Sequence, residues 1–226
     1  MSIIREQKYS SPYEVGRAAV IRSLIPSGNG NPALDLGCGS GFYSRTLSEK
    51  GWLVTAADLE EENVAAARRF AHEGMVGDAF TILDRLRAHD FCLALALELV
   101  EHISQGELLL RRLHEVLGNG GRLIISTPNR ISPEGFWGYY WGEKFRHWGK
   151  WNAWDDTHVK IYSSFGFLRL LRRNGWTVER VVGYWYRGKL PLGIDWSLPF
   201  AFSARFPFNR FGFNVIVCCR RAYLGE

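Results

Sequence analysis

A glycine-rich turn directly after a short apolar run is the feature that most constrains this chain. The run ends at Leu36, the turn reads Gly37-Cys38-Gly39-Ser40-Gly41, and a helical pattern begins at Phe42. Glycines suit such a turn because the backbone bends tightly and a ligand must approach without a Cβ in the way. A strand, a glycine turn and a helix in this order predict a site where a nucleotide-like ligand meets backbone N–H groups at the carboxyl edge of a parallel sheet.

Short apolar runs and amphipathic segments alternate along the whole chain, which predicts an α/β fold. The runs expected to be strands are 32–36, 52–58, 75–77, 91–97, 122–126, 176–182 and 213–219. The segments expected to be helices are 11–24, 42–50, 61–73, 104–117 and 163–174. A chain of 226 residues is expected to form a single domain, spanning 1–226.

Acidic residues follow the next two strands. Asp58 ends the second strand about 20 residues after the turn, where a carboxylate can accept both hydroxyl protons of a ribose; it can also cap the helix expected at 61–73. Leu59 is assigned to the same site. Asp78 follows the third strand, where it can accept from an adenine amino group while the Ala79 backbone contacts the ring edge; an ordinary loop aspartate is the alternative.

Two aromatic-rich stretches, about 131–160 and 184–212, interrupt the pattern. Residues 136–154 alone hold nine aromatic side chains, and a connection of this length is usually functional. The two stretches are expected to form a lid and wall over an apolar substrate, or a small packed cap. A third interpretation is peripheral membrane contact through 184–213, where aromatic residues are mixed with arginines.

Charge and composition limit the kinds of partner and the cellular location that are expected. Residues 160–226 carry 11 Lys or Arg against 3 acidic residues, which suits nucleic acid, anionic lipid or an acidic substrate; a merely solvated surface is the alternative. No apolar run approaches the roughly 20 residues of a membrane span, and no signal-peptide core is present, so a cytoplasmic location is expected. The four cysteines show no metal-type spacing and are expected to be reduced.

Taken together, these motifs resemble the class I S-adenosylmethionine-dependent methyltransferases. The acid-x-G-x-G-x-G form of Asp35–Gly41 is similar to their first motif, whereas dinucleotide sites usually read G-x-G-x-x-G, which disfavours a nicotinamide dehydrogenase. Within the family, Glu98-x-x-Glu101-His102 and Ser126-Thr-Pro-Asn-Arg130 resemble the ubiquinone-biosynthesis O-methyltransferases. The resemblance implies a Rossmann-like, seven-stranded sheet, mostly parallel with an antiparallel last strand, with helices on both faces.

The resemblance also implies cofactor-binding roles. Gly37, Cys38 and Gly39 would hold the methionine part of S-adenosyl-L-methionine, and Asp35 would organise the turn or a bound water. Arg17 sits where an arginine would meet the cofactor's carboxylate, although it also suits a helix surface. Glu98, directly after the fourth strand, completes the set.

Two histidines are candidate catalytic bases because imidazole titrates in the useful range. His102 follows the fourth strand at the ligand edge, and His158 lies at the exit of the first aromatic stretch; packing or capping is the alternative for both. Glu98, Glu101 and His102 can be considered as ligands of a divalent metal. However, a helix would point the adjacent Glu101 and His102 in different directions, so no metal is predicted.

The function predicted is therefore O-methylation of a hydrophobic or lipid-linked small molecule. A nucleic-acid methyltransferase would explain the basic C-terminal part, but the (Asn/Asp)-Pro-Pro-aromatic motif of amino-group enzymes is absent after the fourth strand, where Glu98–Glu101 stands. A non-catalytic module that binds S-adenosylmethionine is the other alternative. The sequence gives no indication of the oligomeric state.

Overall fold

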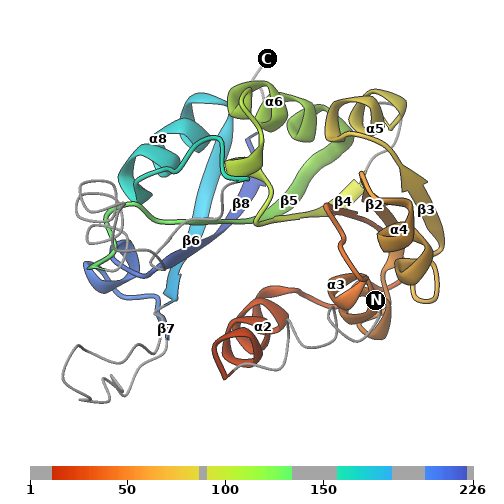
Figure 1. Cartoon of the computed structure of the whole chain (residues 1–226), viewed down its shortest axis with the longest axis horizontal. Coiled ribbons are helices and arrows are strands. Elements are labelled where there is room, and N and C mark those ends of the chain that lie inside the picture. The colour runs from red at the N-terminus through yellow and green to blue at the C-terminus, as the bar shows by residue number, and fades with distance from the viewer. Residues whose placement is uncertain (1–11, 87–90, 134–156, 185–201, 223–226) are drawn as a thin grey trace, which may run out of the picture.

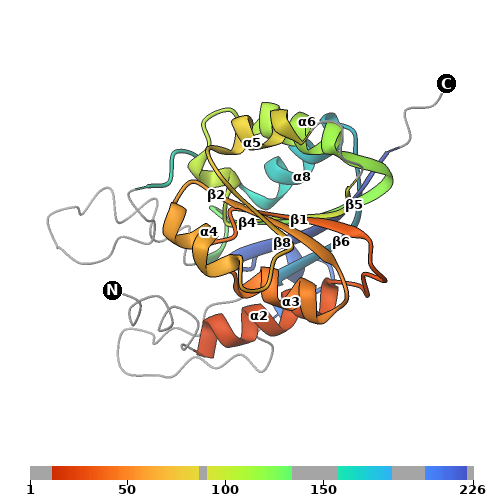
Figure 2. The ribbon, with the colours of Figure 1, turned by 90° about the vertical axis from the view of Figure 1, so that its right-hand side faces the viewer.

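The computed structural model describes residues 12–86, 91–133, 157–184 and 202–222. Their strands form one sheet in the order β3-β2-β1-β4-β5-β8-β6-β7. Helices α5, α6 and α8 cover one face, and α2, α3 and α4 lie on the other, as Figures 1 and 2 show from two directions. The predicted Rossmann-like α/β class is confirmed.

Parallel pairing joins β3, β2, β1, β4 and β5. Strand β8 is inserted between β5 and β6 and runs antiparallel to both, as expected of the last strand. The strands are β1 Pro32–Leu36, β2 Leu53–Asp58, β3 Glu73–Val76, β4 Phe91–Leu97, β5 Leu117–Pro128, β6 Trp176–Tyr184, β7 Phe202–Ser203 and β8 Asn214–Arg221. Seven strands form the expected body, and the two residues of β7 extend its edge.

Five helices match the predicted order, and helix α5 and two 3-10 turns were not predicted. The helices are α2 Pro12–Leu24, α3 Phe42–Glu49, α4 Glu61–Ala67, α5 Ala79–Arg85, α6 Gly106–Val116 and α8 Ser164–Arg173, together with the 3-10 turns η2 Val100–His102 and η5 Phe208–Arg210. Ser11, the expected cap of the first helix, lies outside the described residues.

Apolar side chains on the two faces of the sheet form two large cores, and Cys38, Ala56 and Ala67 form a third, small cluster. Leu34 of β1 and Ala94 of β4 pack with α5, α6 and α8, whereas their neighbours Ala33 and Leu93 pack with α2 and α3. This alternation is the two-residue period of a strand. Strand β4 is buried from Leu93 to Ala96, as a central strand covered on both faces should be.

The predicted ends of two helices are wrong, and so are the predicted starts of the strands β3 and β5 that follow. The helix expected over 61–73 ends at Ala67, because Glu73–Val76 pairs with the end of β2 as strand β3. The helix expected to reach Leu117 stops one residue earlier, and the glycine-rich segment after it is part of β5. Phe91 of β4 lies opposite Leu117 of β5, but Leu93 lies opposite Arg122, so β5 has extra residues between these two pairs. Asn119–Gly121 therefore belongs to an irregular, bulged part of the strand and does not separate the helix from the strand.

One side chain assigned to the buried side of α8 points elsewhere. Phe167, Leu168 and Leu171 are buried as predicted, but Phe165 is 47% exposed. Phe165 therefore lies outside the row of buried side chains with which α8 packs on the sheet.

Most of the two aromatic stretches, residues 134–156 and 185–201, lies outside the described residues. Strand β7 and η5 come from the end of the second stretch. Within the described ranges, no helix combines the length and apolarity needed to cross a membrane.

Candidate functional site

The glycine turn is built as expected, but its N–H groups are used differently. Gly37 and Cys38 donate to the Ala57 carbonyl at 2.8 and 3.0 Å, and Gly39 donates to Asp58 Oδ2 at 2.8 Å. These three N–H groups therefore hold the turn against the end of β2, which corrects the expectation that they face a ligand. The outer side of the turn is open at Gly39, where an added Cβ would meet nothing within 4 Å.

Asp58 is bound by three donors of the protein. Besides the Gly39 N–H at Oδ2, its Oδ1 accepts from the Glu60 N–H at 3.0 Å and from Asn63 Nδ2 at 2.9 Å. A carboxylate offers about four lone-pair positions, so about one remains. Glu60 occupies the N-cap position of α4 without a side-chain cap bond, and Asp58 contributes to this helix start only through the Glu60 N–H and Asn63.

Asp35 is buried at the end of β1, where it accepts a hydrogen bond of 2.6 Å from the Ser44 hydroxyl of α3. Burial raises its pKa from 3.8 to about 6; the Ser44 bond opposes this rise, and the nearby charge of Asp58 adds to it. The folded protein thus holds this proton more tightly than the unfolded chain. The stability from this group is fully present below about pH 4 and is lost as the pH rises through 6.

Replacing Asp35 by asparagine should remove this pH dependence, because the amide keeps an acceptor for Ser44 and carries no charge. Between pH 4.5 and 7.5 we expect the wild type to lose about 2 kcal/mol of unfolding free energy relative to Asp35→Asn. Urea unfolding at the two pH values measures the difference. Asp78→Asn is the matched control. Hydrogen bonds from Thr81 lower the Asp78 pKa, so the difference in unfolding free energy between the wild type and this variant should be the same at both pH values. If the wild type and Asp35→Asn differed by the same unfolding free energy at both pH values, the raised pKa of Asp35 would be contradicted.

Cys38 lies buried within the turn, and its thiol donates to the Gly39 carbonyl at 3.6 Å. Burial and the neighbouring carboxylates raise its pKa, so the thiol is neutral near pH 7. Cys38 is therefore suited to packing and not to nucleophilic chemistry.

The residues expected beside an adenine lie at the ends of β2 and β3. Asp78 caps α5: it accepts from the N–H groups of Phe80 and Thr81 at 3.0 and 3.1 Å, with Ala79 as the first helical residue. The Leu59 side chain is 67% exposed. Asp78 is thus a helix cap and not the ordinary loop aspartate considered as the alternative, and its role beside an adenine stays a prediction.

Arg17 and Glu98, both predicted to contact the cofactor, contact each other. Arg17 is 6% exposed on α2, with its guanidinium 3.1 Å from Glu98 Oε2 and 2.9 Å from Glu14 Oε2. A helix-surface arginine would be solvated, so the alternative of a solvated surface residue is wrong. The ion pair joins α2 to the carboxyl end of β4.

Glu98 is held in an unusual conformation by two residues that the sequence did not indicate. Its φ is +53°, a region that non-glycine residues seldom adopt. Its Oε1 accepts from Ser126 Oγ at 2.8 Å and from Asn214 Nδ2 at 2.6 Å. Backbone strain of this kind costs about 1–3 kcal/mol and concentrates at functional sites. Ser126 could have been found from its place at the end of β5. Asn214 gave no such signal, because it starts an antiparallel strand.

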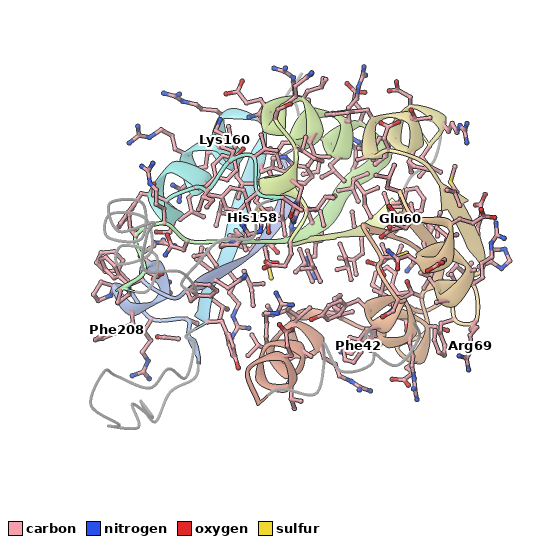
Figure 3. The ribbon with its side chains drawn as sticks, viewed as in Figure 1. Phe42, Glu60, Arg69, His158, Lys160 and Phe208 are labelled. Carbon is pink, nitrogen blue, oxygen red and sulfur yellow. The ribbon has the colours of Figure 1, made fainter. Side chains whose placement is uncertain are left out.

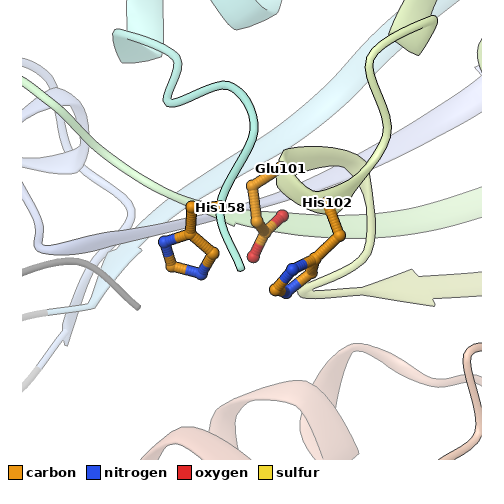
Figure 4. Close-up of side chains that lie close together, drawn as sticks. All are labelled: Glu101, His102 and His158. Carbon is orange, nitrogen blue, oxygen red and sulfur yellow. The ribbon is translucent and has the colours of Figure 1, made fainter. Parts of the chain in front are cut away.

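The two candidate bases come together with a buried carboxylate. Glu101 and His102 belong to η2, and His158 lies in the segment before α8 (Figure 4). One ligand-type atom from each residue lies within 4.8 Å of the others, and the two imidazole ring centres are 4.8 Å apart. The expectation that Glu101 and His102 point apart is wrong, because the tight turn of η2 brings both toward His158. Glu98 is not a member of this cluster.

Backbone contacts bring His158 to this place. The N–H groups of Val159 and Lys160 donate to the Glu101 carbonyl at 2.9 and 3.0 Å, and the Arg130 N–H donates to the Tyr162 carbonyl at 2.9 Å. The segment 157–163 is thereby fixed to both η2 and the end of β5. Figure 3 shows His158 in the middle of the molecule and Phe208 at its periphery.

Electrostatics within the cluster are unusual for a protein interior. Glu101 is fully buried, and neither carboxylate oxygen accepts a hydrogen bond of normal geometry from the described residues. Burial, and next the charge of Glu98, raise its pKa well above the ordinary range. His102 Nδ1 lies 3.1 Å from the Thr157 carbonyl oxygen, which can only accept. The proton of neutral His102 therefore belongs on Nδ1, and Nε2 carries the lone pair.

The cluster lies next to the glycine turn. Leu99, between β4 and η2, contacts Gly37: a Cβ at that position would be 3.3 Å from Leu99 Cδ1. The carboxyl edge of the sheet thus combines a glycine turn with open space at Gly39, a carboxylate after β2 and an imidazole–carboxylate cluster after β4. This combination defines a Rossmann-like protein with a glycine turn and titratable groups at the edge where such folds bind their ligands.

The chain belongs to a methyltransferase family: the family model described as "Methyltransferase domain" matches residues 16–181. The predicted recognition is thereby confirmed. A ubiquinone biosynthesis O-methyltransferase of Caulobacter sp. (strain K31) is 35% identical over 102 residues, which cover 43% of this chain and 40% of that protein. The chain thus matches about two fifths of the length of this curated relative.

Solved methyltransferase structures share the fold. A SAM-dependent methyltransferase from Archaeoglobus fulgidus superposes with a TM-score of 0.64 at 19% identity, covering 97% of this chain and 99% of that one. Magnesium protoporphyrin IX methyltransferase from Synechocystis, solved with bound SAH, gives 0.57 at 18% identity, covering 93% and 85%. These likenesses confirm the fold, while the roles of individual site residues remain predictions.

Proposed function

We propose that this protein is an S-adenosylmethionine-dependent methyltransferase that methylates a hydroxyl group of a hydrophobic or lipid-linked small molecule. The observation that carries the proposal is the position of the Glu101–His102–His158 cluster beside the glycine turn, linked through Leu99. Methyl transfer to a hydroxyl needs a proton acceptor next to the cofactor site. Family membership and the name of the Caulobacter relative support the same reaction.

The turn favours an amino-acid-bearing cofactor over a dinucleotide. A pyrophosphate needs free N–H groups, and those of Gly37, Cys38 and Gly39 are engaged within the protein. A carbonyl oxygen of the turn would instead suit the ammonium group of an amino-acid-bearing cofactor. The open side of Gly39 gives the ligand room. S-adenosylmethionine would supply an electrophilic methyl group on a sulfonium.

The other predicted residues would each hold one part of that cofactor. Asp58 would accept hydrogen bonds from the ribose hydroxyls, and one of its three present donors from the protein would give way to them. Leu59, exposed beside it, would pack on the adenine ring, with Asp78 and Ala79 at the ring edge. Arg17 would turn its guanidinium from Glu14 or Glu98 toward the methionine carboxylate.

His102 is the better-prepared base of the two histidines. The Thr157 carbonyl fixes the proton on Nδ1, so the Nε2 lone pair can take the proton of an acceptor hydroxyl. The buried Glu101 carboxyl, close to both rings, would stabilise the imidazolium that results. His158 would position the acceptor from the opposite side.

The lipophilic character of the acceptor is supported by exposed aromatic residues near the C-terminus. Phe206 and Phe208 are 71% and 61% exposed, and Arg205 and Arg210 flank them. Exposed phenylalanines beside arginines suit an interface with anionic lipid. We propose that this surface contacts the membrane that carries the acceptor.

The test is methyl transfer from labelled S-adenosylmethionine to lipophilic phenols and lipid-linked sugars, presented in anionic vesicles. We expect transfer to at least one acceptor, with the protein floating with the vesicles, and no transfer to RNA or DNA. Calorimetry should show binding of S-adenosylmethionine and S-adenosylhomocysteine but not of NAD. Transfer to nucleic acid alone would favour the alternative enzyme class. Cofactor binding without transfer to any acceptor would indicate a non-catalytic module, and tight NAD binding would exclude the proposal.

A further inference from the structure

Asn214 combines an amide nitrogen of fixed direction with a buried amide oxygen. The residue is 1% exposed at the start of β8, and its Nδ2 donates to Glu98 Oε1 at 2.6 Å. An ionised carboxylate only accepts, so the amide nitrogen and not the oxygen faces Glu98. No donor from the described residues makes a hydrogen bond to Asn214 Oδ1. A buried carbonyl without a donor is costly, so a ligand that donates to Oδ1 would be bound favourably.

The same carboxylate contacts Arg17, which ties the Asn214 amide to the site expected for the methionine part of the cofactor. Glu98 Oε1 is occupied by two donors, Asn214 Nδ2 and Ser126 Oγ, the latter at 2.8 Å. Glu98 Oε2 lies 3.1 Å from Arg17 Nη1. Since both polar atoms of an amide are bonded to one carbon, Asn214 Oδ1 also lies beside the Glu98 carboxylate. One hydrogen-bonded group thus holds two acceptors for a ligand, Glu98 Oε2 and Asn214 Oδ1.

Glu98 is fastened to β5 and stays in place when Arg17 moves. Its backbone N–H donates to the Ser126 carbonyl at 3.2 Å and to Ser126 Oγ at 3.1 Å. If Arg17 turns toward the methionine carboxylate, Glu98 Oε2 therefore loses its cation. Leaving one member of a largely buried ion pair without its partner is costly, so binding is favoured when the ligand brings a second cation to Glu98.

The amino-acid part of the cofactor carries that cation. Its ammonium group is bonded to the same carbon as its carboxylate, so both groups arrive together. An ammonium group has three N–H donors. A carbonyl oxygen of the glycine turn, Glu98 Oε2 and Asn214 Oδ1 would supply three acceptors. The exchange leaves both protein charges paired, Arg17 with the carboxylate and Glu98 with the ammonium group.

We propose that Asn214 is a cofactor-binding residue whose Oδ1 accepts a hydrogen bond from the ammonium group of S-adenosylmethionine, next to the ion pair of that group with Glu98. The assignment rests on the proposed function, because it needs the cofactor of a methyltransferase. It gives the last strand of the sheet a direct part in cofactor recognition. The site would select ligands that keep the amino group.

Calorimetry of the full chain with S-adenosylhomocysteine and with its deamino analogue, in which hydrogen replaces the amino group, tests this assignment. A hydrogen bond to a charged group contributes roughly 10–100-fold in affinity, so the wild type should prefer S-adenosylhomocysteine by at least about 100-fold. Asn214→Leu, which keeps a similar side-chain volume, should reduce this preference by about 10-fold or more. The analogue should bind both proteins with similar affinity.

Two variants separate the amide oxygen of Asn214 from its amide nitrogen. Ser126→Ala is the matched control, because it removes the other side-chain donor to Glu98 Oε1 and leaves the Asn214 oxygen in place. It should keep the preference of the wild type for the amino group. Asn214→Asp loses the donor to Glu98 but keeps an oxygen acceptor, so it should retain most of that preference. Thermal melts show which variants are folded, and Asn214→Ala replaces Asn214→Leu if the larger side chain prevents folding.

The outcomes distinguish this assignment from the methyltransferase proposal. If folded Asn214→Leu kept the full preference for the amino group, the assignment would be overturned. Equal losses in Asn214→Leu and Ser126→Ala, or in Asn214→Leu and Asn214→Asp, would also overturn it, because Asn214 would then act only by holding Glu98. Binding of S-adenosylhomocysteine that does not depend on Asn214 would leave the proposed function standing. No binding of S-adenosylhomocysteine by the wild type would overturn both.

Discussion

Gly41→Ala is expected to prevent stable folding, whereas Gly39→Ala is expected to leave a folded protein that no longer binds S-adenosylmethionine. An alanine Cβ at residue 41 would lie 2.6 Å from the Cα of Ala67 in α4 and 3.0 Å from its Cβ. The backbone φ of +82° adds a penalty of its own. Backbone overlap in a packed layer and a left-handed alanine together cost about 4 kcal/mol, a large share of a typical domain's stability.

Gly39 differs because its Cβ would meet no protein atom within 4 Å. Its φ of +52° costs about 1–2 kcal/mol with alanine, which a folded domain tolerates. The added methyl group would occupy the opening that we assign to the cofactor, so affinity should fall by at least about 100-fold, an energy of roughly 3 kcal/mol. The expected pattern is therefore one variant that loses the fold and another that loses only the ligand.

Circular dichroism melts and calorimetry with S-adenosylhomocysteine separate the two effects. Gly30→Ala, at another glycine of positive φ with open surroundings, is the matched control for backbone strain alone. It should resemble Gly39→Ala in stability and the wild type in ligand binding. Normal binding by a folded Gly39→Ala protein would show that the ligand does not use this side of the turn.

Features encoded by neighbouring residues were predictable from the sequence. The first strand begins and ends as expected, at Pro32 and Leu36, because an apolar run and a glycine turn mark both the strand and its end. The antiparallel last strand followed from the family resemblance. The places of Asp35 and Asp58 beside the turn were also predictable, since both stand at fixed distances from it, whereas their roles toward a ligand stay predictions.

Features that depend on contacts between segments far apart in the sequence were not predictable. His158 reaches Glu101 because Val159 and Lys160 bond to the Glu101 carbonyl, and nothing in local periodicity indicates these contacts. The direction of Glu101 relative to His102 was wrong because η2 was assumed to be a regular helix. Glu98 was found, but its partners Ser126 and Asn214 come from strands that only the sheet order makes neighbours.

Replacing Asp58 by alanine should remove most of the affinity for S-adenosylmethionine and S-adenosylhomocysteine. The variant loses the acceptor that we assign to the ribose hydroxyls, and it also loses the bond that holds the Gly39 N–H at 2.8 Å. Hydrogen bonds to a charged group contribute about 1.5–3 kcal/mol each, so the loss of two predicts a decrease of at least about 100-fold.

Two further variants show how much of the lost affinity comes from the contact with the ribose and how much from the contact with the turn. Asp58→Asn keeps one oxygen acceptor and should bind with an intermediate affinity. Asn63→Ala removes a single neutral donor to Asp58 Oδ1 and frees a lone pair there, so binding should stay close to that of the wild type. Calorimetry with both sulfur ligands gives the affinities, and thermal melts show whether each variant is folded. If folded Asp58→Ala bound both ligands as the wild type does, the ribose assignment would be wrong, and the carboxylate would serve only to hold the Gly39 N–H and the start of α4.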